Sequence, residues 1–215
     1  MQTKYLCGAL ATLQFTVMLA GCSQSADNPY SKVQDPPLVR ATLHTATIAS
    51  PDAALAKQLA AAGYSYTPLI SNYPAAVRVE ALLWKVPEDF AATSIVLMAG
   101  SAGGPNLRML IMPAAAVAPP VEVDAKVEEA FYRNVLGVDV PRLPDRVNLA
   151  GDARVQVWTY FVDDVVAASR RFREAGIAVT FDPVAITTAY LGDHRVMGIQ
   201  APDGTVIELV QSATQ

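Results

Sequence analysis

One carboxylate near the C-terminus has surroundings that call for a chemical explanation. Glu208 stands at the centre of the apolar segment 205–211, TVIELVQ, directly after a Pro-Asp-Gly turn. A buried carboxylate without a partner is costly, so it takes up a proton or acquires a polar or charged partner. Glu208 therefore either faces solvent or faces a group that favours negative charge.

The rest of the sequence excludes several other chemistries. It contains no G-x-S-x-G, P-loop or HExxH motif. The Gly-rich stretch 99–106 precedes an apolar strand rather than a helix, so it predicts a hairpin loop and not a phosphate site. The formal net charge of -4 gives no basic footprint, and no nucleic-acid partner is expected.

The N-terminal segment has the features of a secretory signal. Lys4 precedes an apolar run that is too short to span a membrane and that ends in small residues. Residues 19–22, Leu-Ala-Gly-Cys, resemble the lipobox of bacterial lipoproteins, and the resemblance implies cleavage before Cys22 and lipidation of that residue. The alternative is an ordinary signal with a chance cysteine.

Lipidation would determine both the location and the thiol content of the chain. We expect a signal peptide at 1–21, a polar, Pro-rich tether at 22–38, and a lipid anchor in the cell envelope. Ser23 implies the outer membrane, facing the periplasm, if the source is Gram-negative. Cys7 would leave with the signal and Cys22 would be lipidated, so a cysteine nucleophile is excluded.

Two segments of the chain share one pattern. Residues 43–68 and 156–183 align without a gap upstream of Gly63 and Gly176. Each has a short strand, a helix that ends at the glycine, and a second strand just beyond it. The repeat predicts two related modules.

Further strands complete each module. The first module offers strands at 77–86, 94–100 and 106–113, and the second offers strands at 195–200 and 205–211. This order predicts an α+β fold of two β-α-β-β-β modules, whose curled sheets enclose a cavity. We expect the modules at residues 39–115 and 151–215, joined by a linker at 116–150 that contains one helix.

The second module resembles a known superfamily. Residues 162–179, VDDVVAASRRFREAGIAV, and 201–211, APDGTVIELVQ, are similar to the strand-helix opening and the final strand of the vicinal oxygen chelate superfamily. This superfamily includes glyoxalase I, bleomycin-resistance proteins and extradiol dioxygenases. The resemblance implies a glyoxalase-like fold, although fold alone does not give chemistry.

The resemblance also implies a metal site, of which this chain keeps only part. The superfamily takes one ligand from the first strand and one from the last strand of each module. Those positions hold His44 and Arg108 in the first module, or Met109 in place of Arg108 after a one-residue shift, and Val157 and Glu208 in the second. A catalytic metal needs about three protein ligands. We therefore expect no cofactor, with a weakly bound divalent metal on His44 and Glu208 as the alternative and His194 as a third ligand from the rim.

Strand periodicity predicts which side chains line the cavity. Trp158 and Tyr160 should pack under a helix, because alternate residues of a strand face opposite sides. The residues expected to line the cavity are Arg108, Val157, Thr159, Phe161 and His194. Two partners are open for Glu208, namely Arg108 and His44, while His44 could instead lie at the surface or bond a carbonyl.

Three functions are compatible with this reading. The first is an envelope-anchored lyase or isomerase in which His44 and Glu208 carry out acid–base chemistry on a small molecule, without metal or with weak assistance from one. The second is a non-catalytic small-molecule-binding protein of the bleomycin-resistance type. The third is a structural lipoprotein with a filled cavity. A metal-dependent lyase or dioxygenase is a further alternative, and the modules could pair within one chain or in a homodimer.

Overall fold

The chain is described in a computed structural model. The described residues are 28–31, 39, 41–66, 70–74, 78–87, 90–98, 104–117, 119, 121–149, 151–188 and 191–212. The signal segment, the predicted lipidation site Cys22 and most of the tether lie outside these residues. Within the described ranges, no helix is long and apolar enough to cross a membrane.

Each module contains the predicted repeat. The elements of the first module are β1 (Thr42–Ser50), α1 (Ala54–Ala61), β2 (Ser65–Tyr66), β3 (Ile70–Pro74), α2 (Arg78–Trp84), β4 (Ala91–Met98) and β5 (Asn106–Ile111). The elements of the second are β6 (Arg154–Phe161), α4 (Val165–Glu174), β7 (Val179–Thr188), β8 (Gly192–Gln200) and β9 (Val206–Ser212). Between them lie the short helical segments Ala114–Ala116, α3 (Ala125–Ala130) and Phe131–Leu136.

The strands of both modules join one curled sheet. Their order is β2-β4-β5-β1-β6-β9-β8-β7, and β3 also pairs with β4. The first and last strands of each module pair in parallel, β1 with β5 and β6 with β9. The antiparallel pair of β1 and β6 connects the modules. The predicted α+β fold with two modules and a curled, glyoxalase-like sheet is therefore confirmed.

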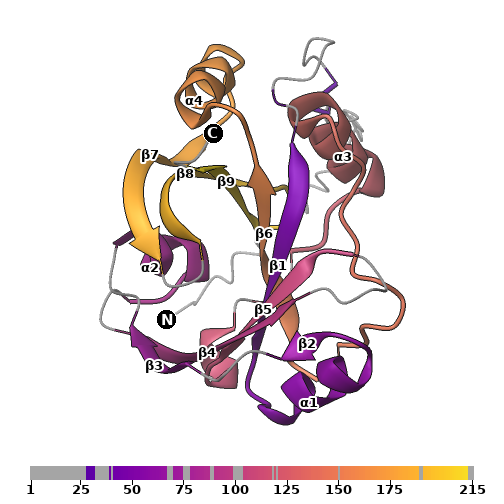
Figure 1. The fold of residues 1–215 in the computed structure, drawn as a ribbon. Coiled ribbons are helices and arrows are strands. Elements are labelled where there is room, and N and C mark those ends of the chain that lie inside the picture. The colour runs from indigo at the N-terminus through magenta and orange to yellow at the C-terminus, as the bar shows by residue number, and fades with distance from the viewer. Residues whose placement is uncertain are drawn as a thin grey trace, which may run out of the picture.

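The two faces of the sheet have separate hydrophobic cores. The outer core contains residues of α1, α4 and the segment Phe131–Leu136, together with Trp158 and Tyr160 of β6, as the strand periodicity predicts. The concave core contains Val157 of β6 and residues of α2. In Figure 1, α2 lies between β7–β8 and β3, so the space that the sheet curls around holds a helix of the chain itself.

The strand predicted at 77–86 is wrong, because Arg78–Trp84 form the helix α2. The alternation of apolar and polar residues extends only over the first few positions of this segment. The residues that follow have high helix propensity, and burial follows helical spacing. The buried residues of α2 are Val79, Glu80, Ala81, Leu83 and Trp84, while Leu82 is exposed.

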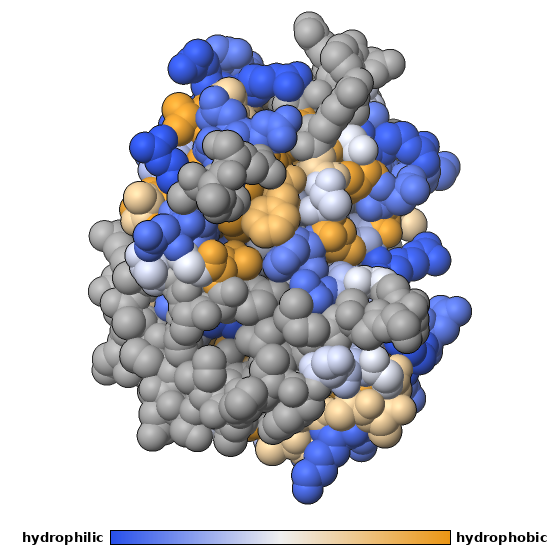
Figure 2. All heavy atoms as spheres, viewed as in Figure 1, coloured by the Kyte–Doolittle hydropathy of each residue, from blue (hydrophilic) through white to orange (hydrophobic). Residues whose placement is uncertain are grey.

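The outer surface is mixed. Figure 2 shows hydrophilic side chains at the upper left and along the right of one face, with hydrophobic ones gathered toward its upper centre. Among the described residues, the large hydrophobic side chains that are exposed come from four separate segments: Leu82, Val121, Val166 and Val184. Single exposed hydrophobic residues are normal on a monomer, and the homodimer stays a prediction.

Candidate functional site

A small polar pocket lies on the concave face, under α2. It is lined by Thr47, Glu80, Arg108, Thr159, Ile186, Leu191, His194 and Glu208. Its cavity volume is about 10 Å³, which is room for about one water molecule. The pocket therefore gathers ionisable side chains from both modules in a nearly closed space.

Strand register brings these side chains together. Arg108 of β5 is the register partner of Thr47 of β1, and Glu208 of β9 is the partner of Thr159 of β6. The neighbours of each residue along its strand point into the outer core, because side chains alternate. The central strands of the two modules thus present two matching pairs to one pocket.

Glu208 is held by the hydroxyl of Thr159. The Thr159 Oγ1 donates a hydrogen bond of 2.7 Å to Glu208 Oε2. Burial raises the pKa of Glu208, and the Glu80 carboxylate raises it further, while the Thr159 hydrogen bond and the charges of Arg108 and His194 oppose this. The surroundings therefore favour the neutral acid form of Glu208 more than water does.

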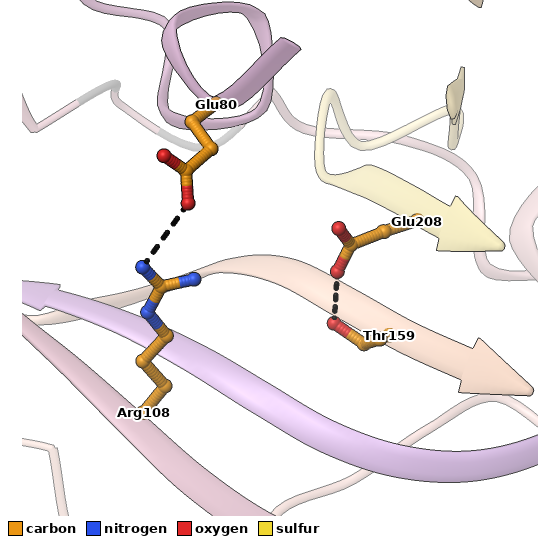
Figure 3. Close-up of polar contacts among 4 residues, drawn as sticks. All are labelled: Glu80, Arg108, Thr159 and Glu208. Atoms are coloured by element: carbon orange, nitrogen blue, oxygen red, sulfur yellow. Dashed lines mark hydrogen bonds and ion pairs between the residues drawn. The ribbon is translucent and has the colours of Figure 1, made fainter. Parts of the chain in front are cut away.

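Arg108 is paired with a carboxylate on α2. Its Nη2 lies 3.6 Å from Glu80 Oε1, and both side chains are almost fully buried (Figure 3). Its guanidinium carbon also lies 5.0 Å from the centre of the Trp84 ring. Glu80 and Trp84 are four residues apart and share one face of the helix. Glu80 is not among the site residues predicted from the sequence, because residues 77–86 are expected there to form a strand; the i, i+4 spacing of Glu80 and Trp84 is the signal that could have identified it.

His194 has one engaged ring nitrogen and one without a partner. Its side chain is buried, and Nδ1 lies 2.8 Å from the carbonyl oxygen of Gly192. A carbonyl only accepts, so Nδ1 carries the proton of this bond. Nε2 is buried and has no hydrogen-bond partner among the described residues. In the neutral ring, Nε2 is therefore a proton acceptor at the edge of the pocket.

His44 does not line this pocket. Its Nδ1 lies 2.7 Å from Thr45 Oγ1, and its ring centre lies 4.3 Å from that of Phe161. Burial lowers the pKa of His44. The pairing of β1 with β6 shifts register between Leu43 and Thr45, so His44 lies at an irregularity of the strand. The structure thus brings Arg108, Thr159, His194 and Glu208 together, whereas Val157 and Phe161 pack with the concave core.

The pocket does not fit a divalent metal ion. In the parts of the chain that the structure describes, no three His, Cys, Asp or Glu side chains are grouped to hold one. The pocket does contain the guanidinium of Arg108, which is always cationic and would repel a metal. The Glu80 carboxylate of the pocket is paired with Arg108, and burial disfavours charge on Glu208, so neither carboxylate is well suited to hold a cation.

A second, more open pocket of about 180 Å³ lies beside the end of α2. It is lined by Lys85, Glu128, Arg154, Asp203 and others. Several of its polar groups already have partners: Lys85 Nζ donates to the Gly204 carbonyl, and the Asp203 carboxylate accepts two hydrogen bonds from Thr205. Its charges are of both signs and several of its polar groups are already paired, so the concave pocket is the stronger candidate site.

Comparisons with known proteins find similarity of fold. No family model matches the chain, and no curated protein matches its sequence. Methylmalonyl-CoA epimerase from Mycobacterium tuberculosis is 17% identical at a TM-score of 0.45, with 85% of this chain and 94% of that chain covered.

A second solved structure is a mutant of 4-hydroxymandelate synthase from Streptomyces coelicolor. It is 14% identical at a TM-score of 0.44, over 80% of this chain and 49% of that one. Both enzymes are members of the vicinal oxygen chelate superfamily. At this level of similarity the function has to be inferred from the pocket itself.

Proposed function

We propose that this protein is a lipid-anchored protein of the cell envelope that binds a small organic molecule in the concave pocket, without a metal. The observation that supports this proposal is the buried polar cluster around His194, whose Nε2 has no protein partner among the described residues. The envelope anchor rests on the lipobox-like residues that end at Cys22.

A purely structural role would not require this cluster. Replacing buried ionic groups with well-packed apolar residues is often neutral or stabilising, and an unpartnered buried polar atom costs about 1–3 kcal/mol. The polar residues that line the pocket lie together at one place, beside an apolar cluster on the same face. A ligand with its own donor and acceptor groups would satisfy His194 Nε2 and offset this cost.

The closed pocket limits the size of the ligand. Undocking α2 would expose Val79, Leu83 and Trp84, each of which is buried. At about 1.5–3 kcal/mol for each side chain, the sum is roughly 5–9 kcal/mol. A ligand that required this would lose about a thousandfold or more in affinity. The ligand is therefore small enough to enter by side-chain movement around a docked α2.

Acid–base catalysis of the lyase or isomerase type is a second candidate, because His194 and Glu208 line the same pocket. A neutral imidazole Nε2 can accept a proton, and a carboxyl group with a raised pKa can donate one. The histidine that accepts the proton in this second candidate is His194, and not His44 as the sequence predicts.

A thermal-shift screen of the full chain with small acids, alcohols, ketones and amides tests the binding function. At least one compound should raise the melting temperature of the wild type, and His194→Gln or Glu208→Gln should weaken its binding at least tenfold. His44→Gln is the matched control and should leave the affinity unchanged. No hits, or hits that are indifferent to His194 and Glu208, would instead support the structural role.

A further inference from the structure

Helix α2 has no counterpart among the described residues of the second module. There, β7 and β8 are adjacent antiparallel strands joined directly across residues 189–191. In the first module, the equivalent strands β3 and β4 are also antiparallel neighbours, but their connection carries α2. Since α2 packs into the concave core, the repeat has acquired an element that occupies its own cavity.

This added helix presents a carboxylate and an aromatic ring to Arg108. Glu80 places a carboxylate oxygen 3.6 Å from Nη2 of Arg108, and Trp84 places an aromatic ring 5.0 Å from its guanidinium carbon. Planar guanidinium groups match carboxylates and stack on aromatic rings. In Figure 3 the Glu80 side chain reaches down from α2 to Arg108, which extends from β5 on the opposite side.

The positive charge of Arg108 is balanced by one carboxylate, that of Glu80. Glu80 and Glu208 both line the pocket with Arg108, and His194 completes its ionisable groups. Glu208 is bonded to the Thr159 hydroxyl, whereas Glu80 forms the ion pair with Arg108, so Glu80 is the carboxylate that balances Arg108. A ligand with a second ionised carboxylate would have to replace Glu80.

We infer that Arg108 is a carboxylate-binding residue, that Glu80 is its intramolecular ligand, and that the molecule bound by this protein is a small carboxylate that competes with Glu80. The identity of the ligand class rests on the proposed function; the exchange of carboxylates at Arg108 does not. Helix α2 then holds the empty protein in a charge-balanced state, and the ligand carboxylate displaces one side chain rather than a whole helix.

Acetate is a suitable probe for this site. Glu80→Ala removes a CH₂–COO⁻ group, and acetate has the same two carbon atoms and the same charge. We expect acetate to bind Glu80→Ala at least tenfold more tightly than the wild type, in calorimetry of the full chain at constant ionic strength. Acetamide, which is neutral and of similar size, is the control ligand and should not bind. Glu80→Ala combined with Arg108→Met should lose acetate binding.

Two results would overturn the inference: equal binding of acetate and acetamide to Glu80→Ala, or acetate binding that persists without Arg108. If Glu80→Ala does not fold, Glu80→Gln keeps the side-chain volume and is titrated in the same way. Acetate affinity at least tenfold above that of the wild type is again expected, and equal affinity overturns the inference. Wild-type hits that are neutral and indifferent to Arg108 would overturn the carboxylate class but leave the proposed binding function standing. Acetate binding to Glu80→Ala with no wild-type hit would overturn the proposed binding function but leave the exchange of carboxylates at Arg108 standing.

Discussion

Truncating Trp84 to alanine should destabilise the protein strongly, because this side chain anchors α2 in the concave core. Trp84 is 1% exposed, and its ring contacts both the apolar cluster and the guanidinium of Arg108. Replacing a buried aromatic residue with alanine costs about 3–5 kcal/mol, from lost burial and from the cavity that remains. With a urea m-value of about 2 kcal/mol/M, the unfolding midpoint should fall by roughly 1.5–2.5 M.

Urea unfolding followed by far-UV circular dichroism measures this effect. Fluorescence is unsuitable, because the substitution removes one of the two tryptophans of the chain. Leu82→Ala is the matched control, since Leu82 lies on the same helix but is 37% exposed. Its cost should stay below about 1 kcal/mol. If both variants lose the same small amount of stability, α2 is not docked as described, and the small size of the ligand no longer follows.

Three further predictions concern charge, anchoring and metal. The pKa of Glu208 is raised in the folded protein above its ordinary 4.5, so the wild type should lose stability relative to Glu208→Gln as the pH rises from about 4.5 to the raised pKa. Urea titrations of both proteins between pH 4 and 8 measure this, and a difference that does not vary with pH contradicts it. Cys22→Ser should release the protein from membranes or block its processing; unchanged fractionation and mass would exclude the lipid anchor. The full chain purified without chelator should contain no stoichiometric divalent metal by elemental analysis, because Arg108 stands in the pocket; one equivalent that is lost in His44→Ala and Glu208→Ala would contradict this.

The sequence predicts the two modules well, because their signals are local. Helix α4 begins at Asp164, whose carboxylate accepts from the Val166 and Ala167 N–H groups, and it is followed by Gly176 at a φ of 75°. The outward direction of Trp158 and Tyr160 likewise follows from alternation along a regular strand. These features depend on neighbours within a few residues.

The candidate site depends on features that are not local. The alignment of the repeat assigns His44 to the ligand position, but the register shift beside it cannot be read from residue types. Glu80 reaches Arg108 only because an inserted segment folds as a helix and crosses the concave face. His194 enters the pocket from β8 through its register with both β7 and β9. Each of these contacts joins elements that are distant along the chain.

The antiparallel pair of β1 and β6 sets the order in which the sheet can be completed during synthesis. β1 is an interior strand, with β5 on one side and β6 on the other. Until β6 emerges, one edge of β1 has no strand to pair with and presents open backbone groups, which is a recognised route to aggregation. A fragment that ends before β6 would carry this open edge permanently. Expression of the first half alone should therefore yield aggregates, whereas both halves produced together have complementary edges through which they can reassemble.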